Sequence, residues 1–206
     1  MGPRNNVLAE FGFVWDPLKI LIRLGVKGGL RGASPQVSLA FQDAVREVGT
    51  LLDPRAAWTI IPGTETNGHP IFAGAVEVAL GVITIGPRLE EECARELADG
   101  DLLRGLVLDA LGSSAVVQVF RAVERLVVAD ALARGLWPSR RYSPGYRDWA
   151  LEEQHFLFSK VDAAAIGVRL NDSCMMIPRK SNSFRINLYA DRSLTTRRLP
   201  DAGSGN

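Results

Sequence analysis

The stretch AVEVALGVITIGPRLEEECARELADGDLLRGLVLDAL, residues 75–111, contains the change from strand to helix that decides the fold. Its first part, 75–85, is rich in β-branched residues and predicts a strand. Pro87 then favours the first turn of a helix, and Asp99-Gly100 is typical of its end. From Leu102 onward, leucines and valines recur with helical spacing, which predicts a second and longer helix.

Upstream of this stretch the pattern predicts one more helix and two strands. Ser34-Pro35 supplies a helix cap and a first-turn proline, and apolar residues then recur with helical spacing until Leu52. Asp53-Pro54 is expected to stop this helix. Glycines separate two β-branched runs after it, and these runs predict strands at 56–61 and 70–73.

Downstream, the long helical pattern contains Gly112-Ser113-Ser114, small residues that allow a kink or a break. A further helix is predicted at 151–158, and the runs that follow predict strands at 166–170, 174–177 and 184–189. The chain is therefore β-rich, then α-rich, then β-rich again. This order predicts an α+β fold: a single domain with a twisted, mainly antiparallel sheet flanked by helices.

We expect three regions along the chain. An N-terminal segment, residues 1–34, contains a short helix at 18–24 and a glycine-rich connector at 25–32. The domain itself is expected over 35–192. Residues 193–206 end in small and polar residues and are expected to form a flexible tail.

Composition excludes several classes of protein. The 24 Lys and Arg residues balance 23 Asp and Glu residues, leaving a net charge of +1, so a protein that mainly grips nucleic acid is disfavoured. Two cysteines exclude a disulfide scaffold, and two histidines without a C-x-x-C motif disfavour a metal cluster. No uncharged apolar run is long enough to span a membrane, and no targeting segment is recognisable. We expect a soluble, cytoplasmic protein.

Most candidate reactive groups have a structural explanation. Cys93 and Cys174 are expected to be small buried residues, and the sequence gives no reason to place either beside His155. His155 itself is interpreted as an ordinary exposed helix histidine. The run Glu90-Glu91-Glu92 is expected to form a solvated helix face near the helix N-terminus. The sequence therefore assigns no catalytic residue and no metal ligand.

One loop differs in kind from these candidates: Arg141-Tyr142-Ser143-Pro144-Gly145-Tyr146. Gly145 permits a ligand to approach bare backbone, Tyr146 offers an aromatic face, and Arg141 has a planar fork that suits a carboxylate. A ligand with a carboxylate, a cationic centre and a planar base would suit these groups. The alternative is a structural Pro-Gly turn with a stacked arginine.

This loop matches the R-x-x-P-G-Y motif of a known family. Residues 141–146 resemble the activation (reactivation) domain of cobalamin-dependent methionine synthase, in its standalone form. Residues 148–154 (DWALEEQ) continue the motif as standalone members do. Residues 166–173 (IGVRLNDS) resemble the family's G-x-x-L-T-x-S strand, and 175–183 (MMIPRKSNS) resemble its M-x-P-x-x-S-x-S. The resemblance covers most of residues 35–190.

The resemblance implies a function and a set of partners. It implies that the chain binds S-adenosylmethionine and supports reductive remethylation of cob(II)alamin, a cobalamin carried by a partner protein. Arg141 would hold the ligand carboxylate, the backbone around Ser143 and Gly145 would line the ligand, and Tyr146 would face the site near the corrinoid. The implied partners are the corrinoid-binding and methyltransferase subunits of a split methionine synthase, with a flavodoxin-type electron donor.

Some positions depart from the family pattern. Phe184 stands where the family usually has glycine, and Arg147 replaces a small residue after the motif. The family's acidic ligand contacts are not aligned, with Gln118, Glu124 and Asp16 as the nearest candidates. Two alternatives stay open: a module that docks a corrinoid protein without S-adenosylmethionine chemistry, and a reactivator of another corrinoid methyltransferase.

Overall fold

The computed structural model describes residues 4–7, 11–146 and 148–196. Within them, a five-stranded sheet has the order β1-β2-β3-β7-β4, and every pairing is antiparallel. A separate two-stranded hairpin pairs β5 with β6. The strands are β1 (Arg4–Val7), β2 (Arg55–Pro62), β3 (Glu77–Thr84), β4 (Trp137–Pro138), β5 (Arg169–Leu170), β6 (Met176–Ile177) and β7 (Ser181–Tyr189). The predicted α+β class with an antiparallel sheet is confirmed.

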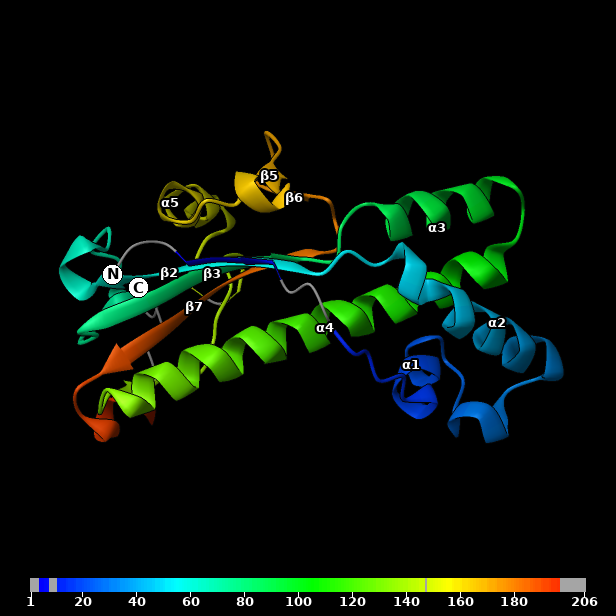
Figure 1. Ribbon diagram of the computed structural model, residues 1–206, viewed down its shortest axis with the longest axis horizontal. Coiled ribbons are helices and arrows are strands. Elements are labelled where there is room, and N and C mark those ends of the chain that lie inside the picture. Colours follow the sequence, from blue (N-terminus) through cyan, green and yellow to red (C-terminus); the bar gives the residue numbers. More distant parts are fainter. Residues whose placement is uncertain (1–3, 8–10, 147, 197–206) are drawn as a thin grey trace, which may run out of the picture.

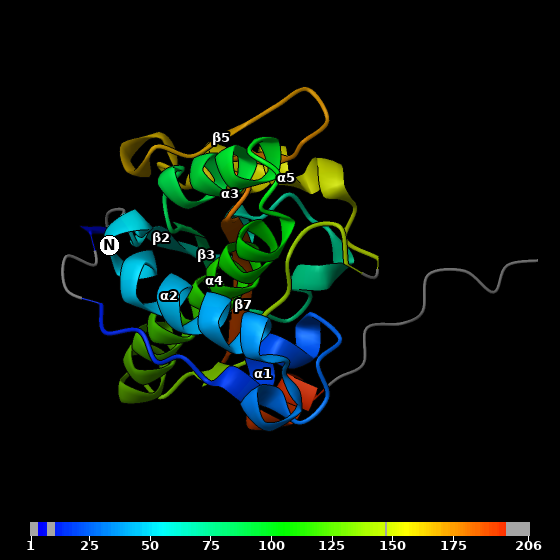
Figure 2. The same cartoon turned by 90° about the vertical axis from the view of Figure 1, so that its right-hand side faces the viewer.

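Helices cover both faces of this sheet. The α-helices are α1 (Pro17–Arg23), α2 (Pro35–Leu51), α3 (Arg88–Ala98), α4 (Leu102–Ala133) and α5 (Gln154–Lys160). Figure 1 shows α4 running along one face, while α5 and the β5–β6 hairpin lie on the other. In Figure 2, seen from the end of the molecule, α1, α2 and α3 gather around α4 beyond the end of the sheet.

The central strands separate two hydrophobic cores. On β7, Phe184, Ile186 and Leu188 belong to the core that contains α4. On β3, by contrast, Val78 and Leu80 belong to the second core, together with residues of α5. Successive side chains of a strand point to opposite faces, so these strands are buried on both sides. That double burial explains why 75–85 reads as a nearly continuous apolar run.

Two of the predicted helix boundaries are found with their capping geometry. The hydroxyl of Ser34 accepts a hydrogen bond from Val37 N at 3.3 Å, and Pro35 begins α2. Gly100, with φ of +90°, follows the last residues of α3. The carboxylate of Asp101 then accepts from Arg104 N at 2.9 Å and caps α4. These short-range signals determine where the helices begin and end.

The predicted kink or break at Gly112-Ser113-Ser114 is wrong, because α4 continues through it. A Cβ on Gly112 would lie 2.2 Å from Leu89 Cδ2, so glycine here lets α3 pack closely against α4. The Ser113 hydroxyl accepts a hydrogen bond from Lys180 Nζ at 2.8 Å. The small residues therefore serve contacts between elements and do not end the helix.

Three predicted strands differ from the structure. Residues Pro70–Phe72 form a 3-10 turn, in which Ile71 N donates to His69 Nδ1 at 3.1 Å, because the proline starts a helical turn. In the region 166–170 only β5 pairs, since Ile166 ends a preceding 3-10 turn. In the region 174–177 only β6 pairs, because Cys174 has a positive φ.

The regions flanking the predicted domain are in contact with it. Strand β1 pairs with β2, and Ile20 and Leu21 of α1 are buried in the α4 core. At the other end, Arg192–Thr196 forms a 3-10 turn. The predicted tail residues 197–206 lie outside the described residues.

By length and composition alone, α4 is the one described helix that could cross a membrane. Half of its most apolar window is buried inside the protein. The core helix of a soluble protein has the same composition. Contacts with α2, α3 and the sheet account for the apolar character of α4.

Candidate functional site

The segment that carries the R-x-x-P-G-Y motif runs along the edge of β7. Ser139 N donates to Asn187 O at 2.8 Å. Tyr142 and Arg185 exchange two backbone hydrogen bonds of 3.1 and 2.8 Å. The hydroxyl of Ser143 then donates to Ser183 O at 2.6 Å, after which the chain turns away at Pro144. The predicted site residues therefore lie where this segment leaves the sheet edge.

A tight turn orients the second half of the motif. Gly145 has a φ of +86°, a conformation that favours glycine, and its N–H donates to Trp149 O at 2.7 Å. Trp149 is fully buried and packs edge-on against Phe72, which anchors the turn. Tyr146 is 67% exposed and presents its ring to solvent. Gly145 thus has a backbone role in addition to any role at a ligand, and Arg147 lies outside the described residues.

Arg141 lies against α4. Its Nη1 is 3.2 Å from Glu124 Oε2, and its guanidinium carbon is 3.9 Å from the centre of the Phe120 ring. Phe120 and Glu124 are one helical turn apart on α4, so one arginine side chain can contact both. The Arg141 side chain remains 38% exposed. The structure thus identifies Glu124 as the acidic neighbour of the motif that the sequence left unaligned.

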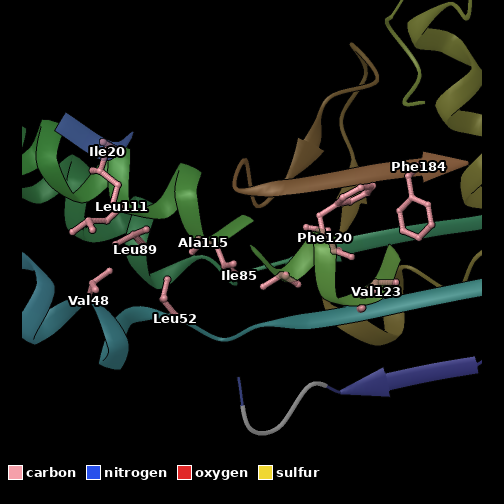
Figure 3. Close-up of a cluster of buried hydrophobic side chains, with 14 of the residues drawn as sticks. Ile20, Val48, Leu52, Ile85, Leu89, Leu111, Ala115, Phe120, Val123 and Phe184 are labelled. Atoms are coloured by element: carbon pink, nitrogen blue, oxygen red, sulfur yellow. The ribbon is translucent and has the colours of Figure 1, made fainter. Parts of the chain in front are cut away.

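Phe184 does not cover the edge of β7. Its side chain is fully buried on the α4 side, and its ring meets Phe120 edge-on, with centroids 5.0 Å apart and planes at 89°. Figure 3 shows Phe184 on β7 and Phe120 on α4 in the same buried cluster. The absence of a side chain at Gly81 makes room for the Phe184 ring. The large residue at this position therefore supports the ring on which Arg141 rests.

Asp16 and Gln118, the other acidic or amide candidates, have different partners. Asp16 caps α1 by accepting from Leu18 N and Lys19 N, and the hydrogen bonds from Lys19 lower the pKa of its carboxyl. The amide of Gln118 accepts from Val14 N at 2.9 Å and donates to Val14 O at 3.0 Å. Both side chains hold the segment that precedes and begins α1. Neither has a recorded contact with Arg141 in the part of the chain that the structure describes.

Sequence reasoning missed a buried arginine beneath the motif. Arg185 is 2% exposed, its guanidinium lies 4.7 Å from the Tyr142 ring, and its Nη1 is 3.4 Å from the hydroxyl of Ser139. Burial lowers the pKa of Arg185 to about 10. The alternation of Ser183, Arg185 and Asn187 with apolar residues was the available signal. The buried charge adds positive potential behind the strand edge, which favours an anionic group there.

Two predictions about reactive groups need correction. His155 is exposed, but its Nε2 lies 3.2 Å from Cys174 Sγ, so it is not an isolated surface histidine. Glu90 is not simply solvated, because it accepts hydrogen bonds from Arg179 N at 2.8 Å and Lys180 N at 3.4 Å. Both cysteines are free and buried, as predicted. The described residues contain no group of three or more His, Cys, Asp or Glu side chains that could hold a metal ion.

Comparison with known proteins identifies a similar fold. No protein-family model matches the sequence, and no curated protein matches it. A crystal structure of the MetH reactivation domain bound to AdoHcy is similar to this chain, with a TM-score of 0.61 and 14% sequence identity. The similarity covers 84% of this chain and 74% of that one. At this identity the likeness shows a shared fold, and the function must be argued from the site.

Proposed function

We propose that this chain binds S-adenosylmethionine and acts as the reactivation subunit of a split cobalamin-dependent methionine synthase. It would support reductive remethylation of cob(II)alamin held by a partner protein. Two observations support this proposal. The fold is similar to a reactivation domain that was crystallised with AdoHcy. The R-x-x-P-G-Y motif lies beside an acidic residue, as an amino-acid ligand requires.

The paired charges of Arg141 and Glu124 are the observation that carries the proposal. The aminoacyl end of S-adenosylmethionine has a carboxylate and an ammonium group on the same carbon. Arg141 uses one nitrogen toward Glu124 and keeps further N–H donors for a bidentate carboxylate. Glu124 is itself partly exposed and has a second oxygen that can accept from the ammonium. The pair therefore matches both charges of the ligand head group.

The remaining motif residues suit the rest of the ligand. The backbone around Ser143 and Gly145 would line the adenosyl or methionine part, since it carries no bulky side chain. The exposed ring of Tyr146 offers a face that attracts a sulfonium and can stack with adenine. Phe120 and Phe184 restrict the movement of Arg141 from below. These residues bind and orient the ligand.

The partners follow from the chemistry of the proposed reaction. The corrinoid of the partner supplies the cobalt that accepts the methyl group. A flavodoxin-type donor would supply the electron, and the corrinoid-binding and methyltransferase subunits would be separate chains. This chain's part is to present S-adenosylmethionine at the surface where Tyr146 is exposed.

A calorimetric titration with S-adenosylmethionine tests the proposal. Wild type, Arg141→Ala and Arg140→Ala are compared, with and without a cob(II)alamin-loaded corrinoid protein. Arg140 is the exposed neighbour of Arg141 and is the matched control. We expect binding to wild type and Arg140→Ala, and about a 10- to 100-fold loss for Arg141→Ala, because a charge-assisted hydrogen-bonded pair is removed.

The other outcomes separate the alternatives. Docking of the corrinoid protein without any binding of S-adenosylmethionine would refute the proposed chemistry and leave a docking module. Binding of S-adenosylmethionine together with remethylation of a corrinoid protein from a different methyltransferase system would change only the client.

A further inference from the structure

A cysteine and a histidine meet on the face of the sheet opposite α4. Cys174 lies in the turn between β5 and β6, and His155 lies in the first turn of α5. Their Sγ and Nε2 atoms are 3.2 Å apart. Thiol and imidazole at this separation can exchange a proton, which is the arrangement that activates a cysteine nucleophile. The R-x-x-P-G-Y site does not use either residue.

The turn holds the sulfur in one position. Cys174 has a φ of +58° and its N–H donates to Asn171 O at 3.0 Å. The side chain of Asn171 accepts from Ser173 N at 3.0 Å and from Met175 N at 2.9 Å. Thus the turn is braced on both sides of the cysteine. The contact with His155 follows from this backbone geometry.

The pair lies beside open space. His155 is exposed and lines a groove of about 700 Å³ that also includes Ser159, Lys160 and the stretch 168–172. Cys174 itself is 7% exposed, so a reagent reaches the sulfur from the side of the imidazole ring. The groove is large enough for a small peptide-like thiol compound.

We propose that Cys174 and His155 form a reactive thiol site that takes low-molecular-weight disulfides and soft electrophiles. With a disulfide, His155 Nε2 accepts the thiol proton and the Cys174 sulfur attacks one sulfur of the reagent. The reagent's S–S bond breaks, a new S–S bond forms to Cys174, and the leaving thiolate takes the proton from the imidazolium. The reagent disulfide is the oxidant, and one thiol is released for each mixed disulfide formed.

Cys93 is the internal reference for this reactivity. It is also buried, but burial and the charge of Asp109 raise the pKa of its thiol to about 11. Relative to a thiol of ordinary pKa, a rise of this size lowers reactivity near neutral pH about tenfold, after allowing for the greater nucleophilicity of the more basic thiolate. One molecule therefore contains the candidate thiol and an inactivated one.

The test is a labelling experiment on the full chain in its native state. Iodoacetamide measures alkylation rates and glutathione disulfide measures mixed-disulfide formation, each followed by peptide mass spectrometry. The variants are His155→Phe, which keeps a ring over the sulfur without a base, and His155→Ala, which also uncovers it. His69→Ala, a change at the other histidine, is the matched control.

We expect Cys174 to react at least about tenfold faster than Cys93 in wild type and in His69→Ala. Both His155 variants should slow Cys174 about tenfold or more and leave Cys93 unchanged. Dithiothreitol should reverse the glutathione adduct. A Cys174 rate equal to or below that of Cys93 would overturn the proposal. So would a rate that His155→Ala raises, because histidine would then only shield the sulfur.

Discussion

Replacing Gly81 with alanine tests the packing beneath the motif. A Cβ at this position would lie 2.4 Å from Phe184 Cζ, 2.5 Å from Phe184 Cε1 and 3.0 Å from Trp58 Cβ. Phe184 is fully buried and its ring also contacts Phe120, so it has little room to move. The backbone at Gly81 has no positive φ, and the clash is therefore the main cost of the substitution.

Two opposing terms decide the magnitude. In a strand interior, alanine gains about 0.5–1 kcal/mol over glycine because the unfolded chain loses less entropy on folding. Overpacking a well-filled core costs about 1–3 kcal/mol. The contact distances to Phe184 are far below van der Waals separation, so the second term wins. We expect Gly81→Ala to lower the free energy of unfolding by about 1–2 kcal/mol.

A double-mutant cycle locates the cause. Phe184→Leu shortens the ring to a smaller side chain and makes room for the new methyl group. Chemical denaturation of wild type, both single variants and the double variant should give a coupling of about 1–2 kcal/mol, with the double variant more stable than the sum predicts. Gly49→Ala is the control, because nothing lies within 4 Å of its added Cβ. In α2 that change should stabilise the protein by up to about 1 kcal/mol.

Additive free energies in the cycle would refute this reasoning. The Phe184 ring would then not be what the added methyl group meets. A Gly81→Ala variant as stable as Gly49→Ala would also contradict the close packing of β3 against Phe184.

Two further predictions concern charge. The folded pKa of Cys93 is about 11, above the ordinary value of 9.0, so between these pH values the unfolded chain releases its thiol proton first and the free energy of unfolding falls. The difference between wild type and Cys93→Ala in urea denaturation should therefore shrink from pH 9 to pH 11, and a constant difference would refute it. Arg104 pairs with Glu47 of α2 and, at 2.7 Å, with Glu96 of α3, so Arg104→Gln should cost about 1 kcal/mol in thermal unfolding, less in high salt, whereas a loss that is the same at all salt concentrations would exclude the ion pairs as its cause.

The architecture follows from short-range signals in the sequence. Ser34-Pro35 and Asp99-Gly100 mark helix ends, and the alternation along β7 distinguishes its two faces. The interpretation of Gly112-Ser113-Ser114 as a break was wrong because a small residue inside a helix also permits close packing by a neighbour. Only the position of Leu89 in three dimensions distinguishes these two roles.

The candidate site was predicted in part. Arg141, Ser143, Gly145 and Tyr146 lie on one turn at the edge of β7, which their closeness in the sequence made predictable. The partnership of Arg141 with Glu124 depends on how the segment crosses α4. The contact between Cys174 and His155 joins a hairpin turn to a helix. Contacts of this kind leave no local pattern in the chain and require the fold.

The most direct test of the central claim compares two ligands at the Arg141 site. S-Adenosylmethionine carries the carboxylate and ammonium that Arg141 and Glu124 are proposed to hold, whereas 5′-methylthioadenosine has the adenosyl group without them. Dissociation constants for both ligands are measured with wild type and Arg141→Ala. We predict about a 10- to 100-fold weakening for S-adenosylmethionine and no change for 5′-methylthioadenosine. Equal weakening of both ligands, or none for either, would contradict the assignment of Arg141 to the ligand carboxylate.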